Sequence, residues 1–306
     1  MGRHSDMRED IYVVDRGSGR IEREPVLADR WLRLAYRLPL RPVCRTVLFR
    51  YAWVSKLLGW YCDLPLSRRR IPRVVEQLAI DMDEAIAGID DFRTFNEFFT
   101  RKLRTSARPY DRHPNTLVSP ADARVTAYPR LDGATCVPVK GRAFTIAKLA
   151  GERSGVADRF DGGTAFVFRL NPSDYHRFHY PASGTTRAAW DVRGRYESVN
   201  PVSLALGLPV FVENRRRITV LQVDEFGEML FIEIGAFGVG AIVQSHSGET
   251  FDKMDEKGFF KFGGSTIVVV MRPGCAEPEN DLVCNTRAGY ETRIRAGETI
   301  ARRPSA

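Results

Sequence analysis

A serine that follows two glycines stands directly before a run of β-branched residues, in Gly263-Gly264-Ser265-Thr266 and Ile267-Val268-Val269-Val270. Glycine has no Cβ, so the carbonyl group of Gly264 is open to attack and its backbone tolerates strained angles. The β-branched run predicts a stiff strand that begins at Ser265. The hydroxyl of such a serine can break the peptide bond before it, although the same pattern is typical of an ordinary loop that enters a strand.

Two of the five histidines, His176 and His179, stand three residues apart in a segment bracketed by Pro172 and Pro181. Imidazole titrates near neutral pH, so either histidine can act as a general base toward a serine hydroxyl. The prolines disfavour a long helix across the segment, and the five cysteines form no Cys-x-x-Cys pair. We therefore expect no metal site here. The structural alternative is a pair of hydrogen-bonded histidines at a strand end.

A third candidate is Asp122, in the turn Ser119-Pro120-Ala121-Asp122 between two apolar runs. An aspartate in such a turn often only caps it. Its functional alternative is the carboxylate that orients a histidine, as in a serine triad. Chain order does not decide whether Asp122, His179 and Ser265 meet, because triads occur in several orders on unrelated folds.

Together these segments resemble the phosphatidylserine decarboxylase family, whose members are self-cleaving proenzymes that carry a pyruvoyl group. Six elements in the family's order carry the resemblance, over about residues 30 to 300: residues 94–109, 119–122, 139–151, 175–179, 234–241 and 262–266. Two positions differ from the family's usual pattern. Ala123 stands where a glycine is usual, and a turn that needs a positive φ would tolerate an alanine poorly. Gly263 stands where a leucine is frequent.

The resemblance implies that Ser265 is converted into the cofactor. Ser265 would attack the Gly264 carbonyl while His179 takes its proton and Asp122 fixes the imidazole tautomer. The resulting ester would lose the α-proton and eliminate the Gly264 carboxylate, and hydrolysis of the dehydroalanine would leave a pyruvoyl group and ammonia. The products would be residues 1–264 and a 42-residue chain, 265–306, which stays woven into the larger piece because it is too short to fold alone.

The pyruvoyl carbonyl would then take the substrate amine as a Schiff base and act as an electron sink for decarboxylation. The resemblance assigns His176 to the support of this step, as the source of the proton that the carbanion needs. Three other functions stay open. They are a pyruvoyl decarboxylase of a soluble amino acid, a non-processing serine hydrolase that uses Asp122, His179 and Ser265 on an external ester, and a non-processing membrane-binding protein.

The positive charge of the chain is concentrated in one segment. The whole chain has a net charge of +8, while residues 29–73 contain eleven basic and two acidic residues interleaved with aromatic and aliphatic ones. Arg50 and Lys56 interrupt the best apolar stretch, so we do not expect a transmembrane helix of about 20 residues. Helices of this kind suit the surface of an anionic bilayer, although a helical layer with a solvated basic rim gives the same pattern.

No nucleic-acid-binding module is recognisable. We therefore expect an anionic phospholipid membrane and phosphatidylserine as partners, no nucleic acid, and a peripheral location on the cytoplasmic face of the cell membrane. A homodimer is left open. Five scattered cysteines fit a reducing compartment.

The sequence predicts an α+β fold with an N-terminal helical membrane-associating layer followed by a largely antiparallel, β-rich catalytic core. Residues 1–25 are expected to form a loose polar arm without an apolar leader, residues 26–110 the helical basic and aromatic region, and residues 111–306 the core. Helices are expected at 71–78 and 83–87. Few helix-length periods separate the later apolar runs, which argues against a parallel sheet. The expected strands are 165–170, 217–223, 229–234, 240–245 and 265–271, with a hairpin around 224–227.

Overall fold

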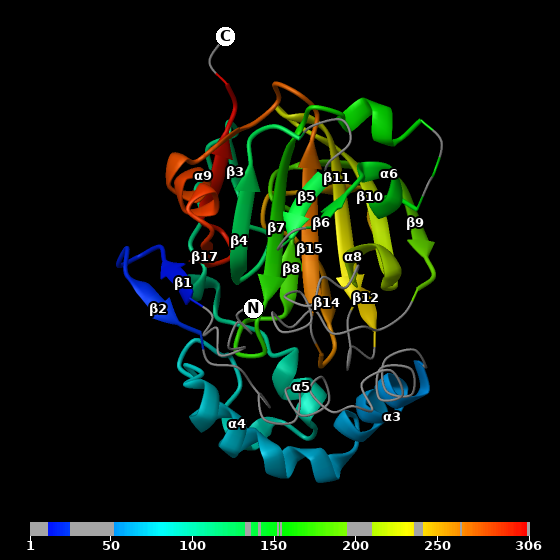
Figure 1. Ribbon diagram of the computed structural model, residues 1–306. Coiled ribbons are helices and arrows are strands. Elements are labelled where there is room, and N and C mark those ends of the chain that lie inside the picture. Colours follow the sequence, from blue (N-terminus) through cyan, green and yellow to red (C-terminus); the bar gives the residue numbers. More distant parts are fainter. Residues whose placement is uncertain are drawn as a thin grey trace, which may run out of the picture.

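A ten-stranded, mostly antiparallel sheet dominates the fold, and short helices pack against its faces and across one of its ends (Figure 1). The computed structural model describes residues 12–24, 52–131, 136–139, 142–151, 153, 155–194, 210–235, 241–263 and 265–304. The α+β class and the antiparallel arrangement predicted from the sequence are confirmed.

The described strands are short, and several of them belong to three smaller sheets. Their bounds are β1 (Tyr12–Asp15), β2 (Ile21–Arg23), β3 (Thr116–Val118), β4 (Ala123–Tyr128), β5 (Cys136–Val139), β6 (Arg142–Phe144), β7 (Thr164–Leu170), β8 (Arg177–His179), β9 (Gly184–Val192), β10 (Arg216–Val223), β11 (Gly227–Gly235), β12 (Ile242–Gln244), β13 (Thr250–Phe251), β14 (Glu256–Phe260), β15 (Ser265–Met271), β16 (Glu277–Pro278), β17 (Glu291–Ile294) and β18 (Thr299–Arg302).

The described helices are also short. The α-helices are α3 (Ala52–Cys62), α4 (Ile71–Leu78), α5 (Phe95–Phe99), α6 (Ile146–Leu149), α8 (Val210–Glu213) and α9 (Asn280–Arg287), and the 3₁₀ turns are η2 (Pro65–Arg70), η3 (Ile89–Asp91), η4 (Thr105–Ala107) and η5 (Ala157–Phe160). In the described part of the chain, no helix has both the length and the apolar character needed to cross a bilayer.

Strand β15 lies inside the large sheet, whose order is β13-β9-β10-β11-β15-β7-β4-β17-β1-β2. All seven residues of β15 are buried, as its β-branched run predicts for a strand covered on both faces. Ile267 and Val269 face one hydrophobic core, while Val268 and Val270 face a second core on the other side of the sheet. The alternation of strand side chains therefore places Ser265 on the same face as Ile267.

A three-stranded sheet, β12-β14-β8, packs over that face near the start of β15. Its Phe178 ring lies 4.9 Å from the ring of Phe260 and 6.2 Å from that of Phe231 on β11, between ring centroids. These contacts bring β8, with the two histidines of its segment, onto the large sheet.

The segment from α3 to α5 forms a helical layer, defined here as Ala52–Phe99, at the end of the large sheet where β15 begins (Figure 1). Its own core is built largely from Phe92, Phe95, Phe98 and Phe99. Thr94 is the N-cap of α5, since its side chain accepts a hydrogen bond from the Glu97 amide. The helical layer packs on the β-rich core through Phe262, which packs against this same cluster.

Several predicted elements are confirmed. Residues 71–78 form α4 and residues 265–271 form β15, with the expected bounds, and the hairpin around residues 224–227 joins β10 to β11. The helix expected at residues 83–87 is wrong. Residues 84–86 pair with the backbone of residues 102–104, and Asp81 accepts a hydrogen bond from the Asp83 amide, which offers the chain a turn in place of a helix.

The amino-terminal segment also differs from the expected loose arm over the residues that are described there. Strands β1 and β2 form a hairpin, and β1 pairs in parallel with β17. Asp15 stabilises its turn by accepting hydrogen bonds from the amide and hydroxyl of Ser18. The basic and aromatic residues at positions 25–51, on which the membrane-layer expectation partly depends, lie outside the described residues.

Candidate active site

Ser265 opens β15 between Gly235 of β11 and Leu170 of β7. Its side chain is completely buried, and its hydroxyl oxygen has no hydrogen-bond partner among the residues that the structure describes. A buried hydroxyl without a partner is costly, so it calls for an explanation such as a catalytic role. Gly264 lies outside the described residues, but Gly263 has a φ of 144°, which residues with a Cβ rarely adopt. Gly263, which stands where the family often has leucine, therefore allows a backbone conformation in which a leucine would be strained.

Asp122 sits beside a guanidinium group. Arg108 donates from Nε to Oδ1 over 2.8 Å and from Nη2 to Oδ2 over 2.5 Å, and the backbone amide of Ala296 donates to Oδ1 over 2.8 Å. The carboxylates of Asp122 and Glu84 together raise the pKa of Arg108, despite its burial. Arg108 was not among the site residues predicted from the sequence, although it stands in the Ala-Arg-Pro stretch of the resemblance.

His179 lies on β8 and is tied to the turn of Asp122 through the backbone, because its amide donates to the Pro120 carbonyl over 2.8 Å. Its Nδ1 lies 3.0 Å from the Met254 carbonyl oxygen. A carbonyl only accepts, so Nδ1 carries the hydrogen and Nε2 carries the lone pair. Burial lowers the pKa of His179, which favours this neutral form. The tautomer is therefore fixed by Met254, in the place that the sequence analysis gave to Asp122.

Met254 is held in a conformation that few residues with a side chain adopt. Its φ is +68°, and its amide donates to the Tyr180 carbonyl over 2.9 Å. Strained backbone of this kind is concentrated at functional sites, where the surrounding structure maintains it. Nothing in the sequence around Met254 signals this role, because the contribution comes from a main-chain oxygen.

His176 is fully buried, with its Nδ1 2.9 Å from the Asp174 carbonyl oxygen and its ring centroid 3.9 Å from that of Phe99. The same reasoning places the hydrogen on Nδ1 and leaves a lone pair on Nε2. Burial lowers the pKa of His176 to about 3, so the imidazole is neutral at neutral pH. Its Nε2 is buried and has no hydrogen-bond partner within the described ranges of the chain.

The structure ties the turn of Asp122 to His179 through the backbone and packs the sheet of β8 near the start of β15, but no hydrogen bond joins the three side chains of the predicted triad. Within the described residues, Asp122 bonds Arg108 and Ala296, His179 bonds Met254, and the Ser265 hydroxyl bonds nothing. The negative charge of Asp122 still reaches both histidines and raises the pKa of each, against the larger effect of burial. Asp122 thus acts on His179 through its field rather than by contact.

The alanine that departs from the family pattern causes no strain. Ala123 begins β4, pairs with Ile294 of β17 and is not among the residues with positive φ. The turn of Asp122 is instead stabilised by Ser119, whose hydroxyl donates to the Ala121 carbonyl over 2.7 Å.

The helical layer reaches the segment before Ser265 through a side-chain clasp, which consists of Asn96, Asp63, Lys261 and Phe262. The Phe262 amide donates to Oδ1 of Asn96 over 2.9 Å, and Nδ2 of Asn96 donates to Asp63 over 2.9 Å. Asp63 also pairs with Lys261, at 3.1 Å. The Phe262 ring packs edge-on against those of Phe95 and Phe99. This clasp fixes the turn two residues before the Gly264–Ser265 bond.

A buried ion pair lies on the strand next to Ser265. Glu233 of β11 lies two residues before Gly235, the strand partner of Ser265, and its Oε1 accepts from the Lys257 ammonium group over 2.5 Å. Both side chains are almost completely buried, and the Lys257 nitrogen lies 5.2 Å from the Phe231 ring centroid. A charged residue inside the apolar run Met229–Ile234 is a signal that the sequence analysis did not use.

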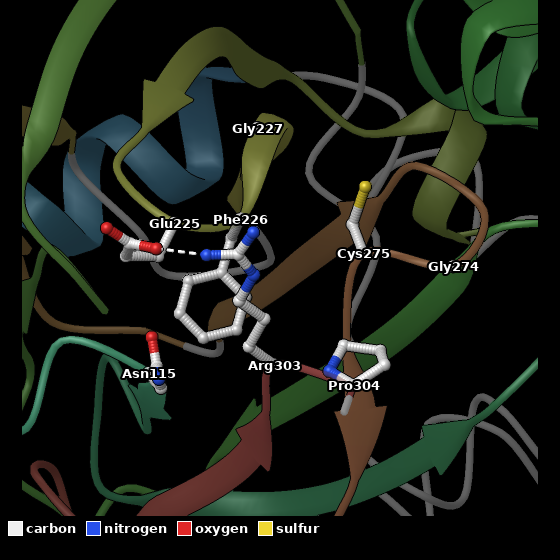
Figure 2. Close-up of a pocket in the computed structure, with 8 residues that line it drawn as sticks. All are labelled: Asn115, Glu225, Phe226, Gly227, Gly274, Cys275, Arg303 and Pro304. Atoms are coloured by element: carbon white, nitrogen blue, oxygen red, sulfur yellow. Dashed lines mark hydrogen bonds and ion pairs between the residues drawn. The ribbon is translucent and has the colours of Figure 1, made fainter. Parts of the chain in front are cut away.

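A cavity opens at the other ends of β11 and β15, around the β10–β11 turn (Figure 2). It is lined by Asn115, Glu225, Phe226, Gly227, Gly274, Cys275, Arg303 and Pro304. Arg303 and Glu225 form an ion pair across it (Figure 2). None of the predicted site residues lines this cavity, so it does not mark the candidate active site.

Comparisons with known proteins agree on one family. The family described as phosphatidylserine decarboxylase matches residues 95–302. A curated phosphatidylserine decarboxylase proenzyme of Ruminiclostridium cellulolyticum is 36% identical over 291 residues, which cover 95% of this chain and 97% of that protein. Proteins of the same description from Clostridium perfringens strain SM101 and Clostridium botulinum strain 657 are 37% and 36% identical, over 95% and 92% of this chain and 99% and 95% of their own lengths.

Proposed function

The chain belongs to the phosphatidylserine decarboxylase family and is an enzyme of that type, and from this premise we propose that it cleaves itself between Gly264 and Ser265 and uses the new end to decarboxylate phosphatidylserine. The products are phosphatidylethanolamine and carbon dioxide. The observation that carries the proposal is the Ser265 hydroxyl, which is buried at the start of a central strand and has no hydrogen-bond partner in the described part of the chain.

In the proposed cleavage, Ser265 Oγ attacks the Gly264 carbonyl carbon and its proton passes to Nε2 of His179. The C–N bond breaks, the amine takes a proton, and an ester joins the two residues. The negative charge of Asp122 favours the imidazolium that forms, since it already raises the pKa of His179. Loss of the Ser265 α-proton expels the Gly264 carboxylate, and water releases ammonia from the dehydroalanine. Residues 1–264 and 265–306 are the resulting chains.

The surroundings of Ser265 fit a pyruvoyl group. Gly235, the partner of Ser265 on β11, has no side chain. No described residue forms a hydrogen bond with the hydroxyl oxygen of Ser265. The pyruvoyl group supplies the electron sink that decarboxylation of an amino acid requires. His176 lies in the same region, since Phe99 packs against both its ring and that of Phe262, and its Nε2 has no hydrogen-bond partner among the described residues. Nε2 of His176 therefore has to take up a proton before it can donate one to the carbanion. This refines the expectation that His176 supplies the proton of the decarboxylation.

We propose further that the protein lies on an anionic phospholipid surface, at the cytoplasmic face of the membrane. The helical layer exposes Leu57, Trp60 and Leu66, each by more than half of its surface. Arg68, Arg69 and Arg70 follow in η2. Exposed apolar side chains beside arginines suit the interface of an anionic bilayer. An ordinary helical layer with a solvated rim has no need to expose a tryptophan.

A lipid assay tests the function directly. The mature protein is mixed with micelles of phosphatidylserine, and phosphatidylethanolamine and carbon dioxide are measured, with free serine as the parallel substrate. Product from the lipid alone supports the proposal. Product from free serine and not the lipid supports a soluble amino acid decarboxylase, and hydrolysis of an external ester by an uncut chain supports the serine hydrolase.

Vesicle sedimentation tests the membrane proposal. A Trp60→Ser, Leu66→Ser double variant is compared with Ile21→Ser, which removes a similarly exposed apolar side chain from β2. We expect the double variant to lose binding to vesicles of phosphatidylcholine with phosphatidylserine and Ile21→Ser to keep it. Equal binding by all three proteins would contradict the placement of the membrane surface on the helical layer.

A further inference from the structure

Arg101, two residues after α5, is a buried cation with unused hydrogen-bond donors. Arg101 is 5% exposed, and its Nε and Nη1 atoms are both buried without an acceptor among the described residues. Only Nη2 donates, to the Ser173 carbonyl over 3.3 Å. A guanidinium group cannot lose its proton in a protein, so its charge stays buried. An unpaired buried charge is expensive, which makes a retained one a candidate for ligand binding.

The nearby carboxylates do not neutralise Arg101 by contact. Asp122 uses its oxygens on Arg108 and Ala296, and Asp174 uses its oxygens on Arg124, at 2.6 Å, and on the Asn171 amide, at 2.7 Å. Arg108 offers the contrast in the same stretch of chain, because it bonds Asp122 and also pairs with Glu84 at 2.9 Å. Arg101 is thus a cation of this site that lacks a carboxylate partner among the described residues.

Arg101 lies beside His176. The ring of Phe99, two residues earlier, packs tilted against the His176 ring. Arg101 Nη2 donates to the Ser173 carbonyl three residues before His176. Burial and the positive charge of Arg101 both lower the pKa of His176. The unpartnered donors of Arg101 and the unpartnered acceptor Nε2 of His176 therefore belong to one region, next to the turn that precedes Ser265. A substrate group with both an oxyanion and hydrogen-bond donors, such as an amino acid headgroup, satisfies both.

We propose that Arg101 binds an oxyanion of the substrate in the active site. The inference rests on the proposed function and deepens it by naming the residue that recognises the headgroup. The oxyanion is the carboxylate of the serine moiety or the phosphodiester of the lipid, since a guanidinium group binds both by charge-assisted hydrogen bonds. Burial strengthens such a bond because no water competes for the donors.

Binding of short-chain, soluble lipids to the mature enzyme tests the inference separately from catalysis. Borohydride treatment beforehand removes the reactive carbonyl, and titration calorimetry measures the affinity. In Arg101→Met we expect phosphatidylserine to bind about 10- to 100-fold more weakly, as loss of a hydrogen bond to a charged group predicts. The matched control is Lys102→Met, which removes the neighbouring cation, an exposed one. Its affinity should equal that of the wild type.

Phosphatidylethanolamine, which keeps the phosphodiester and lacks the carboxylate, separates the two sources. Unchanged affinity for it in Arg101→Met assigns the carboxylate, and an equal loss assigns the phosphodiester. Wild-type affinity of Arg101→Met for both lipids, or an equal loss in Lys102→Met, would overturn the inference. Should Arg101→Met not mature, Arg101→Lys takes its place, with intermediate binding expected and wild-type binding overturning the proposal. Failure of the proposed function is distinct, because the untreated wild type would then release no carbon dioxide from phosphatidylserine.

Discussion

Arg108 binds both carboxylate oxygens of Asp122, at 2.8 and 2.5 Å. This ion pair determines what Asp122 contributes to the site. With its oxygens engaged by Arg108 and Ala296, Asp122 holds no hydrogen bond to His179, and it affects that histidine through its charge. The same pair also stabilises the turn on which the Pro120–His179 backbone contact depends.

The two contributions of Asp122 are separable in a double-mutant cycle. Asp122→Asn leaves the buried Arg108 with Glu84 as its remaining carboxylate partner among the described residues, so we expect the free energy of unfolding to fall by about 1–3 kcal/mol. Asp122→Asn, Arg108→Met removes both charges and should recover much of that loss, measured by urea unfolding in the uncleaved Ser265→Ala background. In the Ser265 background, both Asp122→Asn variants should cleave slowly or not at all. Cleavage of the double variant at the wild-type rate would show that Asp122 only neutralises Arg108 and does not contribute to cleavage.

The two histidines are expected to differ in which step they affect. His179→Ala should block cleavage, because the Ser265 hydroxyl then has no base. His176→Ala should still cleave, while decarboxylation slows by about 10²- to 10⁴-fold, the usual contribution of a general acid or base. Gel electrophoresis reports the first step and carbon dioxide release the second. The assignment fails if His176→Ala stays uncut while His179→Ala matures.

The clasp of Asn96 on Phe262 is expected to set the rate of cleavage. Asn96→Ala removes the acceptor of the Phe262 amide and frees the turn before the scissile bond. Loss of correct positioning should slow cleavage by about tenfold or more. The rate is measured by following uncut chain after refolding. Asn115→Ala, at the distant cavity, is the matched control and should cleave normally. A wild-type rate in Asn96→Ala would mean that the clasp only stabilises the helical layer.

Stability of the uncleaved protein should decline as the solution becomes acidic. The pKa of His176 is lowered from 6.5 to about 3 by burial, so between these values the unfolded chain binds a proton that the folded chain does not. The free energy of unfolding from this group therefore falls as pH drops from about 6.5 toward 3, by at most about 1.4 kcal/mol per pH unit. Urea unfolding of Ser265→Ala at several pH values should show this slope.

In Ser265→Ala, His176→Gln, the part of the slope that belongs to His176 should disappear, because glutamine does not titrate. Glu24 has a lowered pKa and keeps its own acid dependence in both proteins, so the difference between the two curves isolates the histidine. Parallel curves would show that His176 titrates normally in the folded protein.

The strands were predictable because their signals are local. The β-branched run after Ser265 and the turn at residues 224–227 each specify their structure within a few residues. The helix expected at residues 83–87 failed because its backbone pairs with residues 102–104, which a local pattern cannot show. The same limit applies to the site. We could identify Ser265, His176, His179 and Asp122 from the sequence because of their residue types and spacing.

The residues that contact these four side chains carry no such signal in the sequence. Met254 acts through a main-chain oxygen, and its distance of 75 residues from His179 leaves no sequence signal. Arg101 and Arg108 stand among many other arginines, and only their hydrogen-bond partners in the folded chain distinguish the one with unused donors from the one that is paired. Only the packed structure therefore shows that the Met254 carbonyl orients His179 while the Asp122 carboxylate affects it by charge.

The mass of the folded, purified protein tests the central claim most directly. The account predicts that denaturing mass spectrometry finds no 34.6 kDa chain but two chains, 1–264 and 265–306, the smaller of which gains mass with hydroxylamine at its blocked first residue. Under native conditions the two should elute together, because β15 lies between β11 and β7 and β17 between β1 and β4. Ser265→Ala should stay whole. A wild-type protein that is folded and still intact at 34.6 kDa, or a small chain with an ordinary amino terminus, would contradict the account.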